Sequence, residues 1–193
     1  LSGTNERIRV SYHAETGRRT VIESGQGRSG KNKANLSPDG KMRLISVRDN
    51  LRVRHLEKGL EYTLTEKYPD RDVFIRNPVW SPNGKKIAYI QADHSEVRRR
   101  TMLIPDDPSY PTVREVRFAR VGEVIPTLRV GVVSVLENGS EETQWLAVPT
   151  PEEGIYLGQV SWAGNSNELL IEKFSRFRNE RECLLYEVRS AEH

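Results

Sequence analysis

The 193-residue sequence predicts an all-β fold made of repeated small sheets. Stretches 35–45 and 78–90 share one pattern: Ser-Pro-Asx-Gly-Lys, preceded by an apolar residue and followed by an alternating apolar run. Proline is preset for the second position of a type I turn, and glycine accepts the positive φ that follows. Side chains that alternate along the next strand share one face. Both stretches therefore predict β-hairpins.

The spacing of these hairpins predicts the architecture. A weaker third copy starts at Trp162, with residues 163–167 as the turn and 169–171 as the strand. The starts at Leu36, Trp80 and Trp162 lie about 44 and then about 82 residues apart, close to one and two multiples of a propeller-blade repeat. We therefore expect a β-propeller segment of about three and a half four-stranded blades, an incomplete ring.

The first elements are a hairpin and a complete blade. Residues 7–23 alternate around a turn that ends in Gly17 and form a hairpin of a preceding blade. A polar, Gly-rich connector at 25–33 follows. Residues 35–65 form a blade, with turns at Asp49-Asn50 and at 57–59 between its short strands.

The later elements are two further blades. Residues 78–148 form a blade with an insertion at 92–127, where the alternation fades and four prolines occur. The strand pattern resumes around Glu137-Asn-Gly139. Residues 155–190 form a blade that supplies three strands and lacks its last one, so the whole chain, 1–193, is one partial propeller.

Composition argues against several classes of protein. The net charge is only +3 with a pI near 9.0, and the densest basic run, Arg98–Arg100, has no adjacent aromatic residue, so we expect no nucleic-acid binding. The single Cys183 rules out an intrachain disulfide. No apolar run approaches the ~18 residues of a membrane span, so we expect no membrane insertion by this segment. Leu1 is not an initiator methionine, which suggests a processed or excised chain.

Motifs that suggest ligand chemistry have more ordinary explanations. The Gly25–Lys31 stretch imitates a phosphate-binding loop, but Asn32 replaces the Mg²⁺-binding Ser or Thr, and no helix follows. The group Asp93, His94 and Glu96 is sparse for a metal site, and a solvated turn is favoured. The pairs at 141–142 and 152–153 are interpreted as solvated loop carboxylates.

The tryptophans are expected to pack rather than to bind. Trp80 and Trp162 stand just before strand turns, where an indole ring fills space between blades. We therefore predict no catalytic, substrate-binding, cofactor-binding or metal-binding residues in this chain, and no cofactor.

Three stretches together resemble one known family. Residues 78–97 resemble the blade opening in the N-terminal β-propeller of the dipeptidyl peptidase IV family, serine peptidases of the prolyl oligopeptidase clan. Residues 110–133 are similar to that family's next segment, with its Tyr-Pro and Pro-Thr dipeptides. Residues 169–186, including Arg176-Phe-Arg-Asn179, resemble a later Arg-x-Gln-Asn strand pair, with Arg178 where Gln is usual.

The resemblance implies a propeller that caps an α/β-hydrolase domain and admits peptides whose second residue is Pro or Ala. Two departures matter. No Gly-x-Ser-x-Gly nucleophile elbow occurs, so this chain alone should be inactive. The family's substrate-gripping Glu-Glu pair is missing from the corresponding stretch, 66–76. We expect a non-catalytic, substrate-gating propeller portion of such a peptidase; the alternative is a stand-alone protein-interaction propeller that lacks peptidase activity.

Partners and compartment follow from the same expectation. The expected partners are the parent's hydrolase domain, a peptide substrate, or another copy paired through open edges such as 184–188. The resemblance favours the periplasm, the extracellular space or a tethered ectodomain. Asn35 and Asn138 are glycosylation acceptors only in a eukaryotic secretory pathway.

Overall fold

The computed structural model describes residues 8–12, 19–24, 35–47, 50–65, 72–105, 109–136, 139–140 and 142–189. Every regular element in these ranges is a strand, which confirms the all-β prediction. The described residues include no helix that is long and apolar enough to cross a membrane. The strands are β1 (Ile8–Tyr12), β2 (Arg19–Ser24), β3 (Met42–Val47), β4 (Asn50–His55), β5 (Glu61–Thr63), β6 (Val73–Trp80), β7 (Lys86–Asp93), β8 (Arg99–Ile104), β9 (Thr112–Arg117), β10 (Thr127–Leu136), β11 (Gly139–Ser140), β12 (Gln144–Leu146), β13 (Ile155–Trp162), β14 (Glu168–Ser175) and β15 (Arg181–Glu187).

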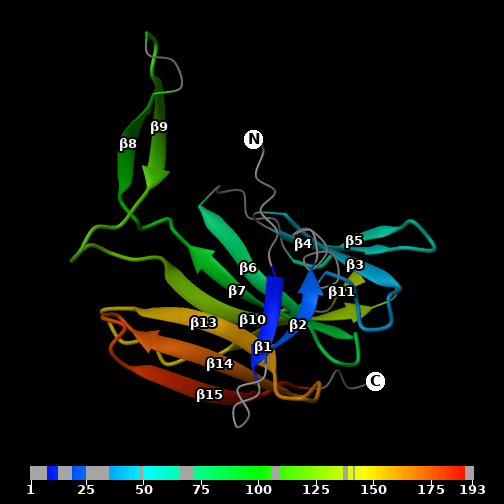
Figure 1. Ribbon diagram of the computed structural model, residues 1–193. Coiled ribbons are helices and arrows are strands. Elements are labelled where there is room, and N and C mark those ends of the chain that lie inside the picture. Colours follow the sequence, from blue (N-terminus) through cyan, green and yellow to red (C-terminus); the bar gives the residue numbers. More distant parts are fainter. Residues whose placement is uncertain are drawn as a thin grey trace.

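These strands form separate antiparallel sheets that do not close into a ring (Figure 1). The first packed sheet has the order β3-β4-β5 and the third has the order β13-β14-β15. The second has the order β6-β7-β10, and β10 also pairs with the short strands β11 and β12. The pair β1-β2 forms a hairpin, and the β8-β9 hairpin projects away from the packed sheets (Figure 1).

The two Ser-Pro-Asx-Gly turns have the same hydrogen bonds. The Ser37 hydroxyl accepts from the Met42 N–H at 2.9 Å, and the Ser81 hydroxyl accepts from the Lys86 N–H at 2.9 Å. Gly40 and Gly84 have φ values of 74° and 70°, which a side chain would strain. The predicted turn chemistry is therefore present at both sites.

The second sheet is buried on both faces. One core cluster fills the space between the first and second sheets, and another fills the space between the second and third. Successive β7 residues divide between them, because side chains alternate across a strand. The first cluster contains Leu44, Leu51, Val53, Leu64, Ile75, Trp80, Ile87, Tyr89 and Val133; the second contains Ala88, Ile90, Val130, Val132, Val160, Leu169, Ile171 and Val188.

The second sheet begins earlier than residue 78, where its pattern starts in the sequence. Strand β6 runs from Val73 and passes a bulge between Arg76 and Val79. Asn77 has a φ of 48° there, and Pro78, which cannot donate a ladder hydrogen bond, lies within the bulge. The sheet was expected to start at Pro78 because proline usually marks the end of a strand. A bulge that contains proline in the middle of a strand is an exception.

In the 35–65 and 92–127 stretches, the observed strands also differ from the predicted blade and insertion. The first packed sheet has three strands, and the place of a fourth is taken by an isolated bridge between Leu36 and Arg43. The stretch at 92–127 contains the paired strands β8 and β9 rather than irregular chain. The β1-β2 hairpin falls within 7–23 except for its last residue, Ser24.

Candidate functional site

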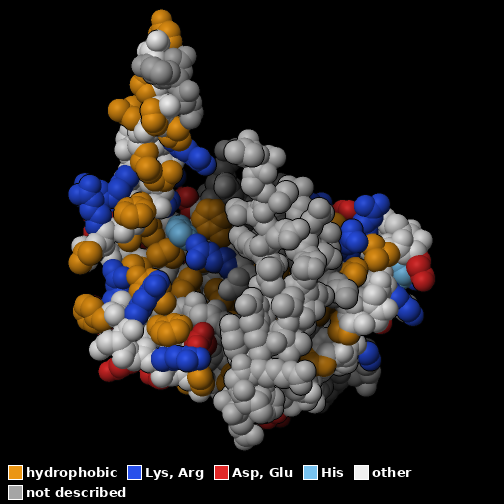
Figure 2. All heavy atoms as spheres, in the orientation of Figure 1, with side chains coloured by type: hydrophobic (Ala, Val, Ile, Leu, Met, Phe, Trp, Pro, Cys, Tyr) orange, Lys and Arg blue, Asp and Glu red, His pale blue; other side chains and the backbone are white. Residues whose placement is uncertain are grey.

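Arginine side chains gather at the base of the β8-β9 hairpin. Figure 2 shows this concentration of positive charge on the face towards the viewer, below the apolar side chains that follow the hairpin outward. Strands β8 and β9 and their flanking loops supply six of these arginines. They are Arg98, Arg99, Arg100, Arg114, Arg117 and Arg120.

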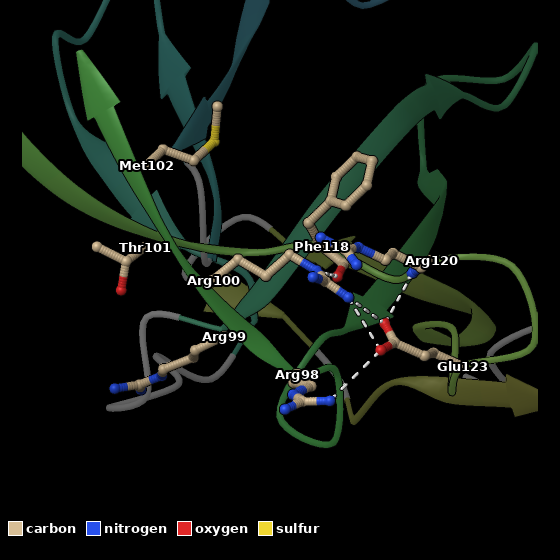
Figure 3. Close-up of a pocket in the computed structure, with 8 residues that line it drawn as sticks. All are labelled: Arg98, Arg99, Arg100, Thr101, Met102, Phe118, Arg120 and Glu123. Carbon is tan, nitrogen blue, oxygen red and sulfur yellow. Dashed lines mark hydrogen bonds and ion pairs between the residues drawn. The ribbon is translucent and has the colours of Figure 1, made fainter.

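Glu123 organises one side of the base. The Arg100 Nη2 donates to both Glu123 carboxylate oxygens at 2.9 Å, and the Arg120 N–H donates to the same carboxylate at 2.8 Å (Figure 3). Arg98 approaches it at 3.7 Å. The Arg120 N–H and then Arg100 lower the pKa of Glu123 below its ordinary 4.5, so it stays charged. This carboxylate fixes the 118–123 loop against a cavity of about 590 Å³.

Asp72 organises the other side. Arg99 and Arg117 lie opposite each other across the hairpin, an arrangement that repulsion would destabilise without a counter-ion. Asp72 Oδ2 supplies it, accepting from Arg117 Nη2 at 2.7 Å and from Arg99 Nη2 at 3.4 Å. The hydrogen bond from Arg117 lowers the pKa of Asp72 and raises that of Arg117. The hairpin is thus attached to the start of β6 through charge.

A second cavity of about 670 Å³ lies beside Asp72. His94 stacks edge-on against Phe74 with ring centroids 5.0 Å apart, and Arg76 Nη2 lies 3.2 Å from His94 Nε2. Burial and the neighbouring Arg76 lower the pKa of His94, so the imidazole is neutral at pH 7. A neutral Nε2 can accept from the guanidinium, which then presents its remaining N–H groups to the cavity.

Arg176 connects the third sheet to the same region. Its Nη1 donates to the Tyr156 hydroxyl at 2.5 Å, and its Nη2 donates to the Glu123 carbonyl at 3.1 Å. The Arg178 guanidinium lies 4.2 Å from the centroid of the Tyr156 ring. The sequence pattern at 176–179 therefore corresponds to a tie between the third sheet and the loop that carries Glu123.

The tryptophans lie in the packing positions expected for them. Trp80 belongs to the first core cluster, and its Nε1 donates to the Asn35 carbonyl at 3.4 Å. Trp162 packs against the second cluster, and its Nε1 donates to the Val79 carbonyl at 3.3 Å. Each indole therefore links its own sheet to the preceding one.

Other sequence candidates are not assembled into sites. Asp93 accepts from the Ser95 N–H, His94 faces Arg76, and Glu96 is exposed. Across the described ranges no three His, Cys, Asp or Glu side chains come together as a metal site requires. Glu142, Glu152 and Glu153 are exposed. Residues 25–31, Asn138, Glu141 and the 66–71 part of the expected acidic stretch lie outside the described residues.

Sequence reasoning missed the residues that form the hairpin base. Arg117 and Glu123 lie in the 92–127 stretch, which was interpreted as an insertion, and Asp72 and Arg76 lie in the 66–76 stretch, for which no site was predicted. The sequence signal for strand β9 was weak: Val113 and Val116 fall on opposite faces of it with charged residues between them, so no apolar face marks the strand. The ion pairs themselves join residues up to 45 positions apart, which no local pattern records.

Comparisons with known proteins agree on one family. The family model described as the dipeptidyl peptidase IV (DPP IV) N-terminal region matches residues 6–193. The "Probable dipeptidyl peptidase 4" of Emericella nidulans is 26% identical over 132 residues, 65% of this chain and 17% of that protein. The dipeptidyl aminopeptidase B of Saccharomyces cerevisiae is 26% identical over 96 residues, 47% of this chain and 11% of that protein.

A solved structure supports the fold. The crystal structure of Porphyromonas gingivalis dipeptidyl peptidase 4 superposes with a TM-score of 0.69 at 19% identity, over 79% of this chain and 23% of that chain. This chain therefore spans a small part of the relatives it matches. The open ring of small antiparallel sheets corresponds to the propeller region of that structure. The chain belongs to the dipeptidyl peptidase IV N-terminal region family.

Proposed function

We propose that this chain is the non-catalytic, peptide-admitting propeller portion of a dipeptidyl peptidase IV-like serine peptidase. The single observation that carries the proposal is the family match over residues 6–193, which spans every described sheet. Relatives with dipeptidyl peptidase names support the peptidase part. The propeller's contribution is to bind and select peptides, while an α/β-hydrolase domain cleaves them.

The chemistry of the hairpin base supports a binding role. Guanidinium, carboxylate and imidazole groups are held by hydrogen bonds around two cavities of about 590 and 670 Å³. Cavities of this size suit a short peptide, with a few polar groups that fix its orientation. The sequence contains no Gly-x-Ser-x-Gly nucleophile elbow, so the covalent steps belong to another domain.

Two measurements on the purified chain test the proposal. We expect measurable peptide binding in a fluorescence titration, and no release of chromophore from a Gly-Pro chromogenic dipeptide. Turnover that a serine-directed phosphonate blocks would contradict the non-catalytic role. The absence of any peptide binding would contradict the admitting role.

A stand-alone interaction module is the second candidate. The observation that favours it is the set of exposed apolar side chains on the projecting hairpin, which includes Met102, Leu103 and Val113. The parent reading frame distinguishes the two candidates: a Gly-x-Ser-x-Gly motif downstream supports the peptidase, and a frame without one supports the module.

A further inference from the structure

We propose that the cavity beside Asp72 binds the carboxylate of an acidic peptide, with Arg76 as the main ligand. The inference rests on the proposed peptide-binding function and adds a preference for one class of peptide.

Two of the four arginines in this cavity are already neutralised. Asp72 accepts hydrogen bonds from Arg99 and Arg117. Glu115, the cavity's other carboxylate, lies 3.9 Å from Arg99. In the described part of the chain no carboxylate lies within ion-pair distance of Arg76 or Arg114. Counted over the described residues, the cavity therefore holds four guanidinium groups and two carboxylates, an excess of positive charge.

Arg76 is held in a position that suits an incoming anion. It follows Ile75, a buried residue of β6, and its Nη2 points to the His94 ring at 3.2 Å. Phe74 fixes that ring by an edge-on contact. Because His94 uses only part of the five-donor guanidinium fork, the rest can bind a carboxylate through two parallel hydrogen bonds.

The walls of the cavity favour a peptide over a small inorganic anion. Phe74, Ile75 and Val116 line it beside the arginines. Apolar walls next to a guanidinium suit a side chain with methylene groups and a terminal carboxylate, as glutamate has. Its volume of about 670 Å³ also exceeds what a single phosphate fills.

A matched pair of peptides tests the inference. We would titrate the 193-residue chain with a rhodamine-labelled hexapeptide rich in Asp and Glu, and with its Asn and Gln counterpart, by fluorescence anisotropy. The acidic peptide should bind at least about tenfold more tightly. Arg76→Gln should reduce its affinity to that of the neutral peptide, and Arg114→Gln should reduce it less.

Arg43→Gln is the control, because Arg43 is an exposed arginine on β3 that does not line the cavity. It removes the same charge and should leave both affinities unchanged. An equal loss in Arg43→Gln and Arg76→Gln would overturn the inference, and so would displacement of the peptide by equimolar phosphate. Equal binding of the two peptides by the parent chain would refute the acidic preference alone. Binding of neither peptide would refute the proposed function as well.

Discussion

Strands β7 and β8 lie a few residues apart in the chain, yet different interactions stabilise them. All but the last of the eight β7 residues are buried, because sheets cover both faces of that strand. Among the described strands β8 pairs only with β9, and its Met102 and Leu103 are 52% and 67% exposed. The sheets are therefore stabilised by burial, whereas the hairpin is attached through Asp72 and Glu123.

The largest effect should come from removing a ring in the packed sheets. Trp80→Ala should lower the free energy of unfolding by about 3–5 kcal/mol, because it leaves a cavity between two sheets and removes a link to Asn35. Leu103→Ala on the hairpin should change it by less than about 0.5 kcal/mol. Urea denaturation measures both, and equal midpoints for the two variants would contradict the comparison.

A smaller loss should follow from adding one carbon to the second sheet. A Cβ on Gly131 would lie 2.9 Å from both Tyr89 and Thr143 and 3.0 Å from Trp145. Gly131→Ala should therefore lower the free energy of unfolding by about 1–3 kcal/mol through overpacking. Thr127→Ala, at the exposed start of the same strand, is the control. A Gly131→Ala variant as stable as this control would mean that the rings move aside freely.

Removing one charge at the hairpin base should speed amide exchange in the hairpin but not in the packed sheets. Asp72→Asn should speed amide exchange in β8 and β9, because the facing Arg99 and Arg117 lose their counter-ion. Exchange in β7 should not change. Glu115→Gln is the matched control on the hairpin, since Glu115 is exposed and its ion pair measures 3.9 Å. Unchanged exchange in β8 after Asp72→Asn would contradict an attachment through charge.

The same ion pair gives the hairpin a dependence on pH. Arg117 lowers the pKa of Asp72 in the folded chain below its ordinary 3.8. The resulting stabilisation is complete above 3.8 and is lost as the pH falls through the lower, folded value. Amide protection of β8 should therefore decline below about pH 3.8, and the decline should be smaller in the Asp72→Asn variant, where Glu123 is the carboxylate that still titrates against Arg100. Exchange at a series of acidic pH values measures it.

Most of the blade framework could be predicted from the sequence. Turn residues act locally, so the Ser-Pro-Asx-Gly-Lys pattern was enough to predict where both hairpins turn. Trp80 and Trp162 also occupy the packing positions expected for them. The start of β6 could not be located, because the bulge at Asn77-Pro78 depends on pairing with β7. A proline there looks like a strand boundary until the partner strand is known.

The candidate site was much less predictable. Arg98–Arg100 was considered only as a basic run for nucleic-acid binding, because the partners of Arg99 and Arg100 lie far away in the sequence. His94 was grouped with Asp93 and Glu96, whereas in the fold it faces Arg76 and Phe74 from the neighbouring strand. Adjacent residues on a strand point to opposite faces, so sequence neighbours are poor guides to a site on a sheet.

The most direct test replaces the hairpin. As proposed above, residues 99–117 complete a binding site on sheets that fold without them. Arg99 and Arg117 lie opposite each other, so a short Gly-Ser linker can join their neighbours. The shortened chain should unfold at the urea midpoint of the parent and bind the acidic hexapeptide at least about tenfold more weakly. Loss of cooperative unfolding, or unchanged affinity for the peptide, would contradict the account.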